Sequence, residues 1–169
     1  IRNHARRQIL NGMGLKKMGR YEIEREIGHG GMAVVYKARD VRLGRFVAIK
    51  IIQTGSFAAN VLGCVRERFE REAKALARLD HPNIVKVYDY GEYEGAPYLV
   101  MDYLDGVTLK ELKKPIRVDT AVKLLTPIAD ALEYVHRHGL LHRDIKPSNI
   151  MMTSENRPVL TDFGIVKWF

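Results

Sequence analysis

The chain has 169 residues, of which 46% are hydrophobic and 28% charged. This length predicts about one ordinary domain, and the composition excludes the disordered and collagen-like classes of protein. No uncharged stretch reaches the roughly 18 apolar residues that a membrane span requires, so we expect no membrane segment in this chain. Cys64 is the only cysteine, which excludes an intrachain disulfide and a cysteine metal cluster.

The net charge of +8 is concentrated at the start of the chain. Residues 1–20 contain six Lys or Arg and no acid, which leaves +2 for the remainder. We therefore expect residues 1–17 to be a basic, disordered extension on a near-neutral domain. The charge pattern does not predict a nucleic-acid partner.

The first half of the chain has mainly the pattern of β-strands. Apolar alternation predicts three antiparallel strands between Tyr21 and Ile52, followed by an amphipathic helix over Val65–Leu79 with Phe69, Ala73 and Leu76 on one stripe. Two more strands are expected over Ile84–Tyr90 and Tyr98–Tyr103, with turns at Gly91 and Gly95. The prediction is a five-stranded antiparallel sheet with one helix.

The second half is expected to be mainly helical. A short helical turn over Leu109–Lys113 precedes a long helix that Asp119 can cap and Gly139 ends, with Leu124, Leu125, Ile128, Leu132 and Val135 on one face. Short strands are expected at Leu140–Leu141, Ile150–Met152 and Val159–Thr161. The fold class is α+β, with two lobes over residues 18–103 and 104–169 and a cleft between them.

Three glycines open the patterned region, in Gly28-His29-Gly30-Gly31-Met32. Alone they could form an ordinary turn or open a dinucleotide-binding helix. Val34, Val35 and Tyr36 favour a strand after the glycines, and thus a hairpin that could cover phosphates with backbone N–H groups.

Lys50 ends the apolar strand Val47-Ala48-Ile49-Lys50, where its charge either reaches solvent or meets an anion. Helix geometry places Glu72 on the same side as Leu76 and Leu79, so Glu72 points inward. We predict a Lys50–Glu72 ion pair that positions the ammonium for phosphates.

The sequence His142-Arg143-Asp144-Ile145-Lys146-Pro147-Ser148-Asn149 fits the pattern H-R-D-x-K-x-x-N, and Asp162-Phe163-Gly164 follows after a strand-sized interval. With these motifs in this order, Tyr21 to Lys167 resembles the bacterial, eukaryotic-like Ser/Thr protein kinases. The resemblance implies a protein-kinase-like two-lobe fold with a partial C-lobe. It also implies a Ser/Thr kinase that moves the ATP γ-phosphate to protein hydroxyls with Mg²⁺.

By position, the resemblance assigns Asp144, Lys146, Lys50 and Glu72 to catalysis, and Asn149 and Asp162 to magnesium. His142 is expected to be structural and to pack near Phe163. The ATP-binding positions are Ile27, Gly28, His29, Gly30, Gly31, Met32, Ala33, Val34, Val35, Ala48, Lys50, Met101, Asp102 and Leu104, with Met101 behind the adenine and backbone groups of Asp102 and Leu104 bonded to it. Ala33 stands where the kinase loop has its third glycine.

The chain ends at Phe169, five residues past Gly164, so we expect a kinase domain truncated shortly after this motif and weak transfer by the isolated piece. Two other functions stay open. One is a nucleotide-binding pseudokinase or interaction module, and the other is a dinucleotide-dependent oxidoreductase, which would need a helix after Gly31. A cytoplasmic location is expected.

Overall fold

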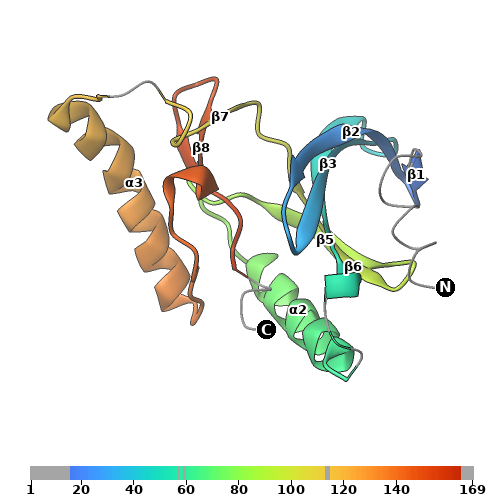
Figure 1. The fold of residues 1–169 in the computed structure, drawn as a ribbon. Coiled ribbons are helices and arrows are strands. Elements are labelled where there is room, and N and C mark those ends of the chain that lie inside the picture. The colour runs from blue at the N-terminus through green and yellow to red at the C-terminus, as the bar shows by residue number, and fades with distance from the viewer. Residues whose placement is uncertain (1–15, 57, 59, 113–114, 165–169) are drawn as a thin grey trace. The chain divides into compact units, whose positions relative to one another are not determined.

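The protein is described by a computed structural model that covers residues 16–56, 58, 60–112 and 115–164. The chain divides into two compact units (Figure 1). The described residues of Ile1–Glu70 and Tyr88–Tyr103 form the N-terminal unit, and those of Arg71–Val87 and Leu104–Phe169 form the C-terminal unit.

The N-terminal unit is built on one sheet, with the strand order β1-β2-β3-β4-β6-β5. Its strands are β1 (Lys17–Met18), β2 (Tyr21–His29), β3 (Ala33–Asp40), β4 (Arg45–Ile52), β5 (Val87–Tyr93) and β6 (Ala96–Asp102). The sheet has six strands where five were predicted, because Lys17 and Met18 pair with Glu22 and Tyr21. Met18 is only 2% exposed, so this short strand adds to the core.

Helix α2 (Leu62–Leu76) begins and ends three residues earlier than its predicted bounds. It follows the short 3₁₀ helix η1 (Thr54–Ser56). The predicted stripe is confirmed, because Phe69, Ala73 and Leu76 are all buried. The helix crosses the division between the two units after Glu70.

The turn between β5 and β6 contains Gly95, one of the two predicted turn residues. Glu94 and Gly95 both have positive φ, 50° and 80°, which is the signature of a two-residue type I′ turn. The prediction of a turn at Gly91 is wrong, because this glycine lies inside β5. A Cβ there would stand 2.9 Å from the Tyr98 hydroxyl oxygen, so the glycine makes room for a neighbouring ring.

The C-terminal unit holds a second sheet of order β7-β8-β9, formed by β7 (Gly106–Thr108), β8 (Ile150–Thr153) and β9 (Pro158–Leu160). The 3₁₀ helix η2 (Pro147–Asn149) leads into β8. Strand β7 was not predicted, and the expected strand at Leu140–Leu141 is absent among the described residues. Gly106 permits β7, because a Cβ there would lie 1.9 Å from the Met152 carbonyl oxygen.

The segment expected to be a short helical turn over Leu109–Lys113 is a turn as far as the structure describes it, and Lys113 lies outside the described residues. The Glu111 carboxylate holds the start of this turn, because it accepts from the Thr108 N–H at 2.7 Å and from the Thr108 hydroxyl at 2.8 Å. The Thr108 N–H bond is the largest cause of a lowered pKa at Glu111.

Helix α3 (Val118–Arg137) begins one residue before the predicted cap, so Arg117 is the N-cap and Asp119 lies in the first turn. In the first turn, the negative charge of Asp119 interacts favourably with the positive end of the helix dipole. Gly139, with φ of 73°, ends the helix as predicted. The predicted apolar face is only partly confirmed: Ile128 and Val135 are buried, whereas Leu125 is 51% exposed. No helix in the described part of the chain has the length and apolarity to cross a membrane.

A buried carboxylate stabilises the β3–β4 turn. Asp40 is 1% exposed, and its Oδ1 accepts from the backbone N–H groups of Arg42 at 3.0 Å and Leu43 at 3.2 Å. Its Oδ2 lies 3.3 Å from Nε of Arg20, an ion pair that lacks the alignment of a hydrogen bond. This carboxylate therefore anchors both the turn and the residue that precedes β2.

Replacing Asp40 with alanine should destabilise the fold. We expect Asp40→Ala to lower the free energy of unfolding by about 2 kcal/mol, because two turn N–H groups lose their acceptor and the Arg20 guanidinium loses one of its two ion-pair partners. Urea unfolding measures this change. The matched control is Asp80→Ala, whose carboxylate is 81% exposed and pairs with Lys86, and it should cost less than about 0.5 kcal/mol. Equal losses in the two variants would contradict the anchor role.

The alkaline titration of Tyr21 is a second test of this unit. Burial, followed by the hydrogen bond to Asp89 at 2.9 Å, raises the pKa of Tyr21 to about 12. Because the folded pKa lies above the ordinary value of about 10, this tyrosine contributes stability that is present below pH 10 and lost as the pH rises through 12. The increase in tyrosinate absorbance near pH 12 should be smaller in Tyr21→Phe than in the unmodified chain. Asp89→Asn should lower the Tyr21 pKa but leave it above 10, and ionisation of Tyr21 at its ordinary pKa in the unmodified chain would refute this expectation.

Candidate functional site

The glycine-rich segment forms the tip of the β2–β3 hairpin. The Gly30 N–H donates to the Ala33 carbonyl at 2.9 Å, and β3 begins directly at Ala33. A strand therefore follows the glycines, as predicted, and the helix that a dinucleotide-dependent oxidoreductase would need is not formed there. Ile27 and Met32, on either side of the tip, are 38% and 39% exposed.

The fold itself does not require glycine at this hairpin tip. A Cβ at Gly28 would come no closer than 3.6 Å to Val35, one at Gly30 would lie 3.7 Å from the Ala33 carbonyl oxygen, and one at Gly31 would meet nothing within 4 Å. None of the three has a positive φ. The missing side chains leave the backbone of the tip accessible.

The strand register gathers several predicted site residues on one face of the sheet. Val35 pairs with Lys50, which pairs with Leu99, and Ala48 pairs with Met101 in a neighbouring row. Cross-strand partners share a face and positions two apart share a face, so these five side chains lie on the same side. Ala48 and Met101 are buried, each 6% exposed.

Two predicted nucleotide-binding residues direct their side chains to the opposite face. Val34 is 2% exposed and belongs to the hydrophobic core cluster with Tyr36, Val47 and Ile49. Asp102 pairs with Val47, and so starts from that same core face. At these two positions only backbone groups remain for a ligand on the face that carries Lys50.

In the C-terminal unit, the Asp144 carboxylate is the centre of a polar cluster. Its Oδ2 lies 2.9 Å from the Lys146 ammonium and accepts from the Asn149 side-chain amide at 2.9 Å, and the same amide also donates to the Asp144 carbonyl at 2.8 Å. The Asp144 side chain is 14% exposed and the Lys146 side chain 47%. The structure thus brings three predicted residues together around one partly buried carboxylate.

A buried histidine connects this cluster to Asp162-Phe163-Gly164. His142 is 1% exposed, and its Nδ1 accepts from the Asp144 N–H at 3.3 Å, so Nε2 carries the proton and donates to the Thr161 carbonyl at 2.7 Å. The His142 and Phe163 rings lie 4.5 Å apart, and the Gly164 N–H donates to the His142 carbonyl at 2.9 Å. The expected structural role of His142 is confirmed.

Two of the four non-glycine residues with positive φ in the described part of the chain lie at the same place. Arg143 and Asp162 have φ values of 66° and 53°, in the left-handed region that non-glycine residues rarely occupy. Such residues persist only where neighbouring contacts hold them, and they gather at functional sites. Here the contacts of His142 and Gly164 supply that restraint.

Glu72 makes an ion pair that the sequence did not predict. Its Oε1 accepts from the Arg143 guanidinium at 2.7 Å, and the Glu72 side chain is 14% exposed. Both residues belong to the C-terminal unit, whereas Lys50 belongs to the other. The Lys50–Glu72 ion pair therefore stays a prediction.

Thr161 is a residue of this cluster that the sequence analysis did not identify. It is 9% exposed, and both its N–H, at 2.8 Å, and its hydroxyl, at 3.1 Å, donate to the Asn149 carbonyl. Its own carbonyl accepts from His142, so Thr161 links the two motifs. Its only sequence signal is its place directly before Asp162.

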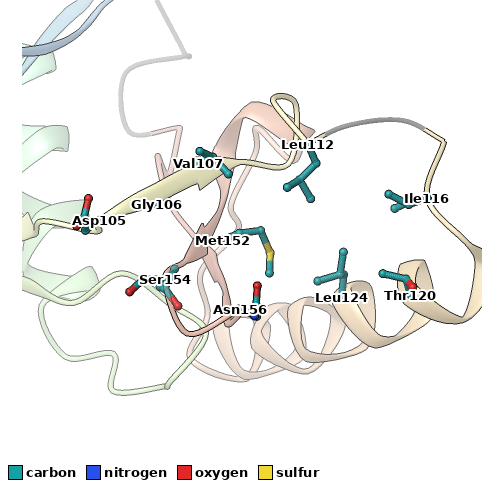
Figure 2. Close-up of a pocket in the computed structure, with 11 residues that line it drawn as sticks. Asp105, Gly106, Val107, Leu112, Ile116, Thr120, Leu124, Met152, Ser154 and Asn156 are labelled. Carbon is teal, nitrogen blue, oxygen red and sulfur yellow. The ribbon is translucent and has the colours of Figure 1, made fainter.

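A cavity of about 880 Å³ lies elsewhere in the C-terminal unit (Figure 2). Leu112, Leu124 and Met152 line it together with eight other residues from the β7, α3 and β8–β9 regions. None of these eleven is among the predicted site residues. The cavity is thus separate from the Asp144 cluster.

Comparison with known proteins agrees with these motifs. Residues 21–169 match the family described as protein kinase domain. The chain is 45% identical to a probable serine/threonine-protein kinase PknB of Lactococcus lactis, over 88% of this chain and 24% of that protein. It is 44% identical to the serine/threonine-protein kinase PrkC of Bacillus subtilis, over 90% of this chain and 24% of that protein. The chain therefore spans about a quarter of the length of these curated relatives.

Solved structures give the same result. The apo form of PpkA-294 superposes with a TM-score of 0.81 at 32% identity, over 91% of this chain and 62% of that one. The PknI kinase domain of Mycobacterium tuberculosis has a TM-score of 0.79 at 33% identity, over 92% of this chain and 63% of that one. With the hairpin, the Asp144 cluster and the family match together, this chain belongs to the protein kinase domain family.

Proposed function

We propose that the chain is the nucleotide-binding part of an ATP-dependent protein serine/threonine kinase, which transfers the γ-phosphate of ATP to Ser or Thr hydroxyls of proteins. The observation that carries the proposal is the Asp144 carboxylate, held by Lys146 and Asn149 within 2.9 Å. A carboxylate fixed in this way can orient a hydroxyl, and the ammonium beside it can meet the negative charge of a phosphoryl group.

The N-terminal unit supplies the proposed ATP contacts. The backbone at Gly28, Gly30 and Gly31, which no Cβ covers, would lie over the phosphates. Lys50 would meet the phosphates from the same face as Val35, Ala48 and Met101, whose apolar side chains would contact the adenine. Backbone groups of Asp102 and Leu104 would hydrogen-bond its edge.

Asn149 and Asp162 are the proposed magnesium ligands. Asn149 uses its amide nitrogen on Asp144, which leaves the amide oxygen as the atom for a cation. Two oxygen donors suit Mg²⁺, which keeps waters and phosphate oxygens as its other ligands, although no three His, Cys, Asp or Glu side chains cluster in the described part of the chain. Bound there, magnesium would neutralise charge on the phosphates.

In the proposed reaction, the bond from the γ-phosphorus to the bridging oxygen of ADP breaks as a bond to the Ser or Thr oxygen forms. Asp144 orients that hydroxyl and accepts its proton, while Lys146 holds the transferring group. Lys50, oriented by Glu72, holds the remaining phosphates. Because ATP is a cytoplasmic metabolite, this activity implies a cytoplasmic location, with protein substrates as the partners.

The test is nucleotide binding followed by transfer. Mg-ATP at about 100 times its dissociation constant should stabilise the chain by about 2.7 kcal/mol and raise its melting temperature by several degrees, whereas NAD should not. Lys50→Met and Asp162→Asn should each remove the ATP shift, because each deletes a charge that faces the phosphates or the metal. Asp80→Asn, a change at an exposed carboxylate, is the matched control and should keep the shift.

Transfer is measured with radiolabelled ATP and a protein rich in Ser and Thr. Phosphate found on the substrate and lost in Asp144→Asn supports the kinase assignment. Binding of Mg-ATP with no transfer in a longer chain that extends past Phe169 would favour the pseudokinase alternative, because weak transfer by the 169-residue chain alone is already expected. An NAD shift without an ATP shift would overturn the proposal.

A further inference from the structure

The end of β6 is held by side chains on both faces of the sheet. Val47 and Asp102 form the last residue pair between β4 and β6. The Asp102 side chain starts on the core face, and the Tyr103 side chain contacts residues of the opposite face. The backbone at Asp102 and at Leu104, on either side of Tyr103, is what the proposed function assigns to the adenine.

On the core face, the Tyr88 hydroxyl of β5 donates a hydrogen bond to the Asp102 carboxylate. The Arg45 guanidinium lies 3.5 Å above the Tyr88 ring, and its buried Nε has no hydrogen-bond partner among the described residues, so the ring face is a principal contact of this cation. Burial, with the neighbouring Asp102, raises the pKa of Tyr88 to about 12. The phenol therefore stays protonated, and remains a donor, throughout the neutral range.

On the opposite face, the Lys37 ammonium and the Phe46 ring hold Tyr103. The Phe46 and Tyr103 rings meet edge to face, with centroids 6.5 Å apart at 67°. The Lys37 ammonium lies 4.1 Å from the Phe46 ring centroid and 4.8 Å from that of Tyr103, and it also pairs with Glu24 at 3.1 Å. Contacts of this geometry are attractive beyond the area that they bury.

We propose that Tyr88 on one face, and Phe46 with Lys37 on the other, are positioning residues that aim the backbone groups of residues 102–104 at the adenine. This inference rests on the proposed function. If Tyr88 loses its hydroxyl, the Asp102 carboxylate must turn to find another donor, and the peptide groups beside it turn too. The phosphate contacts depend on Lys50 and on the β2–β3 hairpin, so they should not change.

The experiment distinguishes contacts to the adenine from contacts to the phosphates. Calorimetry with the 169-residue chain measures the dissociation constants of Mg-ATP and of magnesium tripolyphosphate, which has no base. In Tyr88→Phe we expect Mg-ATP to bind about tenfold more weakly, because a backbone group that no longer faces the adenine loses about one hydrogen bond to it, while tripolyphosphate changes by less than about twofold. Tyr90→Phe removes a hydroxyl two residues along the same strand and should change neither constant.

A double-mutant cycle assigns the effect to the Tyr88–Asp102 pair. Asp102→Ala should weaken Mg-ATP binding about as much as Tyr88→Phe, and the double variant should be no weaker than either single one. Phe46→Ala, at a side chain that is 47% exposed, tests the other face without opening the core. It should weaken Mg-ATP binding about threefold and leave tripolyphosphate unchanged.

The outcomes separate this inference from the function on which it rests. If the unmodified chain binds neither compound, the proposed function fails. If it binds Mg-ATP but Tyr88→Phe and Phe46→Ala leave that affinity unchanged, the positioning inference alone is overturned. Equal weakening of ATP and tripolyphosphate in both variants would also overturn it, because that is the result of a merely structural role.

Discussion

The two-residue period of β4 is the constraint on which the rest of the N-terminal unit depends. Val47, Ile49 and Ile51 are each at most 1% exposed and form the centre of the core. Burying each of these side chains stabilises the fold by about 1.5–3 kcal/mol. A slip of one residue would move Lys50 into that core and turn all three side chains to the other face, so the hydrophobic pattern that builds the sheet also fixes the face on which Lys50 lies. Fold and site are therefore set by the same residues.

Sequence-based prediction was most accurate for elements whose structure follows from the local pattern of apolar residues. The β4 strand and the stripe of α2 follow from apolar spacing, and both are confirmed. Of the two predicted turn residues, Gly95 is confirmed and Gly91 is not, and the ring of Tyr98, seven residues away, explains why Gly91 stays in the strand. Strand β7 has just three residues. It can pair with β8 because Gly106 has no Cβ and so comes close to a backbone carbonyl of β8, more than forty positions away. Contacts that are distant in sequence leave no local signal.

The same division applies to the site. Motif spacing identified Asp144, Lys146 and Asn149, which the structure brings together, but not the groups that hold them. Thr161 and the Arg143–Glu72 ion pair join segments 12 and 71 positions apart. Their geometry follows from how Asp162-Phe163-Gly164 packs on His142, which depends on the whole C-terminal unit. Residues that carry the chemistry can thus be recognised in the sequence, because only a few residue types can do that chemistry. The residues that position them are of common types, and only the fold shows which of them make these contacts.

Recognition through the backbone explains why the proposed adenine and phosphate contacts carry such weak sequence signals. Wherever a ligand is held by N–H and C=O groups, the side chain at that position is available to the fold. Val34 uses its side chain for the core and Asp102 uses its carboxylate for Tyr88, while both offer backbone to the other face. In our proposal, the backbone at the end of β6 is aimed by Tyr88 on the core face and by Phe46 with Lys37 on the face that carries Lys50. Selectivity for the base would then depend on residues that do not contact the nucleotide as well as on residues that do, so substitutions that alter it are to be sought on both faces of the sheet.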